Sequence, residues 1–134
     1  MKIKNIWKKI EEPLELHVDS RGAIVDLFYN EKISHIALVV SEPGTIRGNH
    51  YHKETTQHIL ITKGSLEYWY KPISSNKEAE MILAVEGDLI STKPNEIHAL
   101  KIGPEGNEFL VFSQGKRGGK DYESDTFRVS NIIK

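Results

Sequence analysis

The chain has 134 residues and a mass of 15.3 kDa, which is the size of one compact domain. Its 38% hydrophobic and 28% charged residues exclude a disordered or fibrous chain. With 18 Lys and Arg against 19 Asp and Glu, the formal net charge is -1, so no broad positive field attracts nucleic acid or anionic lipid. Cysteine is absent, which excludes disulfides, thiol nucleophiles and cysteine-based zinc sites.

The first residues, 1–12, are rich in lysine and lack the apolar core and cleavage site of a secretory signal. No apolar run elsewhere has the length needed to span a bilayer. We therefore expect a cytoplasmic protein with neither a membrane partner nor a nucleic-acid partner.

The pattern along the chain is that of strands and turns. Residues 3–12 carry a faint helical pattern, but their lysines suit the edge of a sheet equally well. After them, glycine and proline divide the sequence into about eight apolar, strand-sized segments: 23–29, 33–40, 58–62, 65–70, 81–85, 88–92, 99–102 and 109–112. A basic loop at 115–119 precedes a final extended arm from Tyr122. The pattern predicts an all-β sandwich or small barrel.

Two histidines stand two positions apart in the segment 48–52. In a strand, His50 and His52 project from the same face, so their imidazoles converge. Burying two imidazoles in an apolar β framework is costly, which favours a functional role. The other isolated histidines are interpreted as surface or hydrogen-bonded residues: His17, His35 and His58. The aromatic run 68–70 is interpreted as packing.

The segment 44–57, followed by a glycine at position 64, resembles the first motif of the cupin family, and the segment 87–98 resembles the second. Gln57 stands where most metal-binding cupins carry Glu, and the second motif is one residue short. The resemblance implies a single cupin domain over residues 1–134, a double-stranded β-helix or jelly-roll barrel. Its core would span about 19–114, between extended arms at both ends.

Two shorter motifs narrow the resemblance. Asp19-Ser20-Arg21-Gly22 and Arg47-Gly48-Asn49-His50 are similar to signatures of the dTDP-4-dehydrorhamnose 3,5-epimerases and the dTDP-4-keto-6-deoxyhexose 3,4-ketoisomerases. The likeness to the ketoisomerases is closer, in chain length and in the His-x-His-Lys run followed by Gln. The resemblance implies that His50 and His52 are the catalytic acid/base pair. Substrate-binding roles would fall to four further side chains: Arg21, Arg47, Gln57 and His98.

The active-site tyrosine of these families does not carry over. Residues 36–40 contain none where ketoisomerases have one, and residues 109–112 contain none where epimerases have one. The remaining groups are still sufficient for proton transfer, because a neutral imidazole with a pKa near ~6.5 can remove the acidified hydrogen beside the ketone of a 4-keto sugar. Arg47 can hold a phosphate or the developing oxyanion.

The resulting hypothesis is a small enzyme, an isomerase or epimerase, acting on a nucleotide-linked 4-keto-6-deoxy sugar in the synthesis of surface polysaccharide sugars. It would need no cofactor. Alternatively, the same cluster would bind a divalent metal: His50, His52, Gln57 and His98 form a three-nitrogen, one-oxygen set suited to Zn, Fe, Ni, Cu or Mn. The chain would then be a metal-dependent cupin enzyme for another small molecule. A non-catalytic sugar-binding cupin is the third hypothesis.

Two expectations concern geometry. The four residues of this set should point into one cavity, with Arg47 close by. The molecule should form a homodimer, because a sheet of short apolar strands needs its edges covered. Residues 1–9 or the arm from Tyr122 are the expected covers of those edges.

Overall fold

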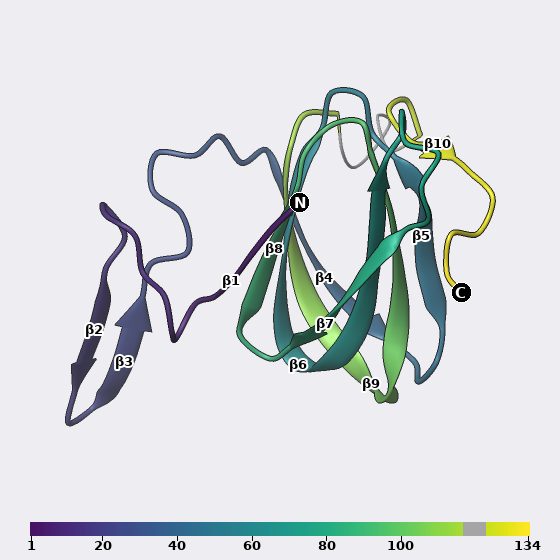
Figure 1. The fold of residues 1–134 in the computed structure, drawn as a ribbon. Helices are drawn as coiled ribbons and strands as arrows, with labels where there is room; N and C mark the ends of the chain where they lie inside the picture. The colour runs from purple at the N-terminus through teal and green to yellow at the C-terminus, as the bar shows by residue number, and fades with distance from the viewer. Residues whose placement is uncertain (117–122) are drawn as a thin grey trace.

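The structure is a computed structural model in which residues 1–116 and 123–134 are described. All regular elements of these residues are strands, which confirms the predicted all-β class (Figure 1). In chain order they are β1 (Lys2–Asn5), β2 (Leu16–Asp19), β3 (Gly22–Val25), β4 (His35–Ser41), β5 (Ile46–Tyr51), β6 (Thr56–Pro72), β7 (Glu80–Val85), β8 (Asp88–Thr92), β9 (Glu96–Gln114) and β10 (Phe127–Arg128). Most of the predicted basic loop at 115–119, and Tyr122, fall outside the described residues.

Two long strands, β6 and β9, form the centre of the barrel and pair antiparallel along most of their length. Each changes its second partner halfway along. The first part of β6 pairs with β8 and the later part with β7, while the first part of β9 pairs with β5 and the later part with β4. This exchange of partners folds the eight-stranded sheet into the jelly-roll barrel that the cupin resemblance implied (Figure 1).

A glycine pair permits the bend at the middle of the two long strands. Gly64 has a φ of +74°, and a Cβ at that position would lie 2.3 Å from the carbonyl oxygen of Gly106. The β6–β9 register shifts on both sides of this point, between Ile61 and Lys63 and between Gly64 and Leu66. The sequence pattern predicted separate short strands at 58–62 and 65–70. The structure joins them in one strand, because the bend leaves the hydrogen-bond ladder continuous.

Apolar side chains fill the barrel and part of its outer surface. The inner cluster comes chiefly from β6, β8 and β9: Ile59, Ile61, Leu66, Tyr68, Ile90, Leu100, Ile102, Phe109 and Val111. A smaller outer cluster of Ile6, Leu60, Leu89 and Phe112 is covered by the segment that includes Leu27, Phe28 and Ile33. Burial on both faces explains the continuous apolar runs at residues 59–61 of β6 and 109–112 of β9.

The terminal strands cover the edges of the barrel sheet. Strand β1 pairs with β8, and β10 pairs with β5. Both belong to the arms outside the expected core of about 19–114. Strands β2 and β3, in contrast, form a hairpin of their own, which stands away from the barrel (Figure 1). Among the described residues there is no helix of the length and hydropathy needed to cross a membrane.

Candidate functional site

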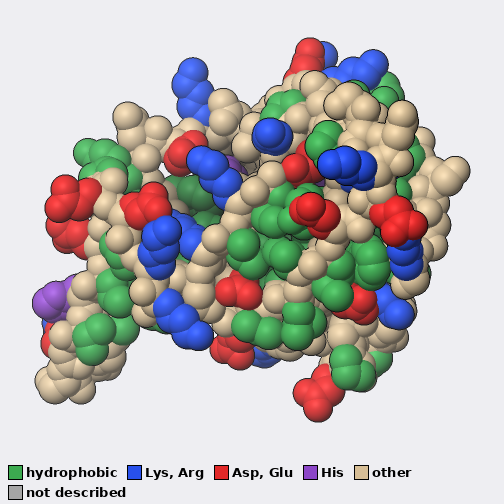
Figure 2. Space-filling model, in the orientation of Figure 1, with side chains coloured by type: hydrophobic (Ala, Val, Ile, Leu, Met, Phe, Trp, Pro, Cys, Tyr) green, Lys and Arg blue, Asp and Glu red, His purple; other side chains and the backbone are tan. Residues whose placement is uncertain are grey.

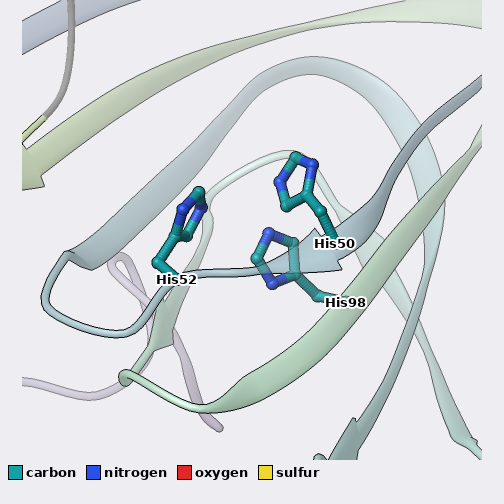
Figure 3. Close-up of side chains that lie close together, drawn as sticks. All are labelled: His50, His52 and His98. Atoms are coloured by element: carbon teal, nitrogen blue, oxygen red, sulfur yellow. The ribbon is translucent and has the colours of Figure 1, made fainter. Parts of the chain in front are cut away.

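Three histidines meet inside the barrel, as their positions in the sequence suggested (Figure 3). His50 belongs to β5, His52 follows that strand directly, and His98 lies on β9 in register with His50. Their ring centroids are 4.9 Å apart for His50 and His52, 4.7 Å for His50 and His98, and 5.5 Å for His52 and His98. One ring nitrogen from each lies within 4.8 Å of the others.

A β-bulge in β5 brings these rings together. Gly48 and Asn49 have left-handed backbones, with φ of +87° and +57°, and the register against β9 shifts between Gly48 and His50. A Cβ at Gly48 would lie 2.8 Å from the carbonyl oxygen of His98, so a glycine is required for β5 to approach β9 this closely. Bulges of this kind re-aim side chains near functional sites.

A cavity of about 260 Å³ lies beside the cluster. His50 and His98 line it, and so do Arg47 and Gln57, as expected. His52, which is 3% exposed, is not among the lining residues. Its ring therefore backs the other two histidines and does not face the open space. The apolar remainder of the wall comes from the barrel interior: Val39, Ile46, Ile59, Leu100, Phe109 and Val111.

The hydrogen bond to His52 determines which of its nitrogens is available. Its Nδ1 lies 2.7 Å from the carbonyl oxygen of Asp125, which can only accept, so Nδ1 carries the proton. Its Nε2 is buried and has no hydrogen-bond partner among the described residues. His98 is held in a similar way, with Nδ1 donating to the carbonyl oxygen of Glu96 at 3.2 Å. In a neutral ring this leaves the lone pair on Nε2, for a proton or a metal ion.

Tyr68 of β6 also lines the cavity, although its place in the sequence indicated only packing. Its ring stacks on His98 with centroids 6.2 Å apart and planes 4° from parallel, and its hydroxyl pairs with Thr92. Burial raises the pKa of Tyr68 well above its usual value, although the hydrogen bond to Thr92 works in the other direction. The phenol is therefore neutral and acts as a hydrogen-bonding group. The site therefore contains a tyrosine, which comes from β6 and not from residues 36–40 or 109–112, where the related families carry theirs.

The arginines are distributed differently from the prediction. Arg47 lies at the cavity, and its guanidinium donates to Ser41 Oγ at 2.7 Å and to the Val40 carbonyl oxygen at 3.3 Å. Arg21 was expected at the same ligand, but it lies at the tip of the β2–β3 hairpin and does not line the cavity of its own chain. There it pairs with Asp19 at 2.7 Å, and this hydrogen bonding from Arg21 is the main reason that the pKa of Asp19 is lowered.

A third arginine takes a place at the cavity. Arg128 of β10 lies opposite His50 in register and forms an ion pair with Glu123 at 2.8 Å. No motif in the sequence pointed to it, because its position depends on pairing between strands far apart in the chain. The cavity thus has two exposed cationic side chains, Arg47 and Arg128, beside its neutral and imidazole groups.

The donor set fits a divalent metal of the borderline class. Three imidazoles converge, two of them are held through Nδ1 by backbone carbonyls, and the buried Nε2 of His52 has no other partner among the described residues. Histidine ligands held by such outer contacts are typical of metal sites. His50, His52 and His98 would supply the nitrogen ligands, and Gln57, on the wall of the same cavity, would supply an oxygen ligand.

A jelly-roll barrel that gathers histidines from neighbouring strands into an interior cavity is a cupin. Comparison with known families adds the more particular assignment. A family model described as the polysaccharide biosynthesis C-terminal domain matches residues 17–113, and the chain belongs to that family.

Similar proteins are found among curated sequences and solved structures. A UDP-2-acetamido-2,6-beta-L-arabino-hexul-4-ose reductase of Pseudomonas aeruginosa is 26% identical over 84 residues, which are 62% of this chain and 23% of the reductase. The chain therefore spans about a quarter of the length of that curated relative. A 3,4-ketoisomerase of Helicobacter canadensis has a TM-score of 0.74 at 20% identity, covering 96% of this chain and 90% of the ketoisomerase. A dTDP-4-dehydrorhamnose 3,5-epimerase of Sulfolobus tokodaii has a TM-score of 0.68 at 17% identity, covering 86% and 73%.

Proposed function

We propose that this chain moves a proton on a nucleotide-linked 4-keto-6-deoxy sugar, as an isomerase or epimerase, in the synthesis of polysaccharide sugars. The observation that carries the proposal is a cavity in which imidazoles, a neutral tyrosine and two arginines share one wall. The family match and the names of the similar proteins support the substrate class.

In this reaction the imidazole of His50, which lines the cavity, removes the hydrogen on the carbon next to the ketone. The electrons pass to the ketone oxygen and give an enediolate. Returning the proton to the former carbonyl carbon, while the hydroxyl proton passes from the oxygen of the first carbon to the former ketone oxygen, moves the ketone. Returning the proton to the opposite face of the first carbon gives an epimer and restores the original ketone. His52, 4.9 Å from His50 between ring centroids, would exchange the proton with it or stabilise its charged form.

The sugar and its diphosphate would occupy different parts of the site. A volume of about 260 Å³ is near the lower end for a small-molecule cavity and suits a sugar ring. Arg47 and Arg128 are exposed at this cavity, and guanidinium groups bind phosphate through paired hydrogen bonds. The nucleotide would therefore extend toward the surface of the molecule.

The test is hydrogen exchange at C3 of a dTDP- or UDP-linked 4-keto-6-deoxy sugar in deuterated buffer, followed by NMR. We expect exchange that persists in the presence of a chelator and falls about 10²–10⁴-fold in His50→Asn, the usual effect of losing a general base. His58→Asn is the control, because that histidine bonds Ser91 and is not among the residues that line the cavity. The proposal fails if none of these sugars exchanges, or if the control variant loses as much activity as His50→Asn.

The fit of the histidine cluster to a divalent metal supports a second candidate, a metal-dependent cupin enzyme acting on another small molecule. Bound at this site, the ion would act as a Lewis acid on a substrate oxygen. Metal analysis of the purified protein tests this candidate. We expect about one bound ion per chain, reduced in His98→Ala and unchanged in His35→Ala, if the cluster is a metal site.

We also propose that two copies form a homodimer through the β2–β3 hairpin and β4. Among the described residues the hairpin has no partner strand, and a free two-stranded hairpin is marginally stable in water. Within residues 1–116 and 123–134, β4 pairs with β9 alone, and its outer face exposes Ile36, Leu38 and Val40. Laying each hairpin on the other copy's β4 forms two identical contacts, which close the assembly. The exchange would bring Arg21 toward the partner's cavity, since Val39 of β4 lines that cavity.

A further inference from the structure

Asp125 is a buried carboxylate that holds the C-terminal arm against the loop after β5. Only 3% of the residue is exposed. Its oxygens accept hydrogen bonds from the backbone nitrogens of Lys53 at 2.8 Å, Glu54 at 3.0 Å and Thr55 at 2.8 Å. The Thr55 hydroxyl adds a fourth hydrogen bond at 2.8 Å. A cluster of backbone donors around one carboxylate is a strong local anchor, because each bond is charge-assisted.

The same residue makes a second contact with its backbone. The carbonyl oxygen of Asp125 accepts the hydrogen bond from Nδ1 of His52 at 2.7 Å. Beyond it, the arm continues as β10 along β5, and the backbone nitrogen of Val129 donates to the Asn49 carbonyl oxygen at 2.9 Å. Two sets of contacts therefore fix the carbonyl group that meets His52: the hydrogen bonds to the Asp125 carboxylate, and the pairing of β10 with β5 just after it.

We propose that Asp125 is the positioning residue of the histidine cluster: its carboxylate anchors the arm so that its carbonyl oxygen keeps His52 in the Nδ1–H form. Nε2 of His52 is then left as an acceptor facing the interior of the cluster. With the arm displaced, the Nδ1 contact is lost, and the ring can carry its proton on Nε2 instead. A ring protonated on Nε2 can neither accept a proton nor bind a metal ion through that atom.

Direct measurement of the tautomer tests this inference without a substrate. Long-range ¹H–¹⁵N NMR on protein labelled at histidine nitrogen distinguishes protonated from unprotonated ring nitrogens, and His52→Gln identifies the signals of His52. We expect a pure Nδ1–H form in the unaltered chain. In Asp125→Ala, Nδ1 should shift toward the unprotonated range and Nε2 toward the protonated range.

Two further variants separate positioning from general destabilisation. Thr55→Val removes one of the four donors to the carboxylate with little change in shape, and should produce a smaller shift in the same direction. Asp88→Ala is the matched control, because Asp88 is also buried and accepts from a backbone nitrogen, that of Val85 at 2.9 Å, outside the histidine cluster. It should leave the His52 tautomer unchanged. An unchanged tautomer in folded Asp125→Ala or Thr55→Val, or an equal shift in Asp88→Ala, would overturn the inference.

The consequence for catalysis rests on the proposed function and is measured separately. Losing an outer contact of a metal-ligating histidine typically reduces metal affinity or activity about 10–100-fold, and we expect a similar range for an acid/base histidine. In Asp125→Ala we expect that reduction in kcat for hydrogen exchange, together with a rise in KM, because Arg128 lies on the same arm and only Arg47 is held independently of it. A shifted tautomer in a protein inactive on every such sugar would refute the proposed function and support the role of Asp125. Loss of activity with the Nδ1–H form retained would refute the role of Asp125.

Discussion

Tyr68 and Thr92 form a hydrogen-bonded pair at the wall of the cavity, and both are almost fully buried. At the scale of single residues, this pair shows how the site holds a neutral phenol in place. Because burial keeps the proton on Tyr68, the hydroxyl can donate to an oxygen of the ligand without becoming charged.

Removing the hydroxyl in Tyr68→Phe should lower the free energy of unfolding by about 1–3 kcal/mol, because the Thr92 hydroxyl is left buried without a partner. Adding Thr92→Val should restore much of that loss, since replacing both partners with apolar groups of similar shape is nearly neutral. Urea unfolding of the two single variants and the double variant measures the coupling. Losses that simply add would show that the two hydroxyls do not depend on each other.

His58 lies on β6, half-buried, with its Nδ1 2.7 Å from Ser91 Oγ. It agrees with the interpretation of an isolated histidine as a hydrogen-bonded residue. Burial lowers the pKa of His58 below 6.5, and the charge of Glu31 opposes this shift only in part. The folded chain therefore binds a proton at this site less readily than the unfolded chain.

The sign of that shift predicts the pH dependence of stability. The neutral His58 contributes its full share to the free energy of unfolding above pH 6.5. This contribution declines as the pH falls from 6.5 to the lowered pKa of His58 in the folded chain, and below that pKa no more is lost. His58→Asn keeps a polar atom near the position of Nδ1 and removes the titration. Unfolding measured from pH 7.5 to 5 (roughly the range of histidine titration) should show a smaller decline in this variant. An equal decline in both proteins would contradict the assignment.

At the scale of elements, the bend in β6 and β9 determines which side chains enter the barrel. Gly64 combines a left-handed backbone with a 2.3 Å approach to the Gly106 carbonyl oxygen. Gly64→Ala should lower the free energy of unfolding by about 1–3 kcal/mol, the usual cost of a strained backbone. The clash of the new Cβ with the Gly106 carbonyl oxygen should increase this loss. Gly44→Ala is the matched control, since φ there is +71° and nothing lies within 4 Å of a new Cβ. Equal losses by urea unfolding would show that the close approach is unimportant.

The same bend explains which parts of the site the sequence could predict. Gln57 lines the cavity as expected, Ile59 two positions on lines it too, and the spacing of His50 and His52 correctly brought their rings together. Past the register shifts of β6 the inward positions change from odd to even, so Tyr68 turns inward. Simple alternation along the sequence, started at position 57, does not predict this change of face.

The C-terminal arm was less predictable for a different reason. Asp125 and Arg128 lie outside every motif, and their local sequence has no periodic pattern. Their roles arise only when β10 pairs with β5 and the carboxylate meets the amides of residues 53–55. Contacts between distant segments of this kind are set by tertiary packing, which local patterns do not encode.

At the scale of the whole molecule, exposed apolar side chains occur on several strands, among them the hairpin, β4 and β7. The hairpin exposes Val18 and Ile24 at 68% and 67%, and Figure 2 shows apolar side chains on this projecting part of the molecule. The outer face of β4 is also apolar, with Leu38 exposed to 59%. Large apolar surfaces rimmed by charges are typical of protein contacts.

Leu38→Lys should convert the proposed dimer to a monomer, because a charge would be buried in the contact. Analytical ultracentrifugation at micromolar concentration measures the change. Leu83→Lys is the control, since Leu83 is 63% exposed on β7, away from the proposed contact. A monomer before any substitution would refute the dimer, and dissociation by Leu83→Lys alone would refute the assigned face.

The β10 arm also has a consequence for how this domain is delimited. The family match ends at residue 113, whereas Asp125 and Arg128 follow it. A domain boundary placed at the end of the family match would retain His50, His52 and His98. It would discard Asp125, which orients His52, and Arg128, which adds positive charge beside His50. Grafting this domain into another protein, or shortening it for expression, therefore has to carry the tail as part of the functional unit.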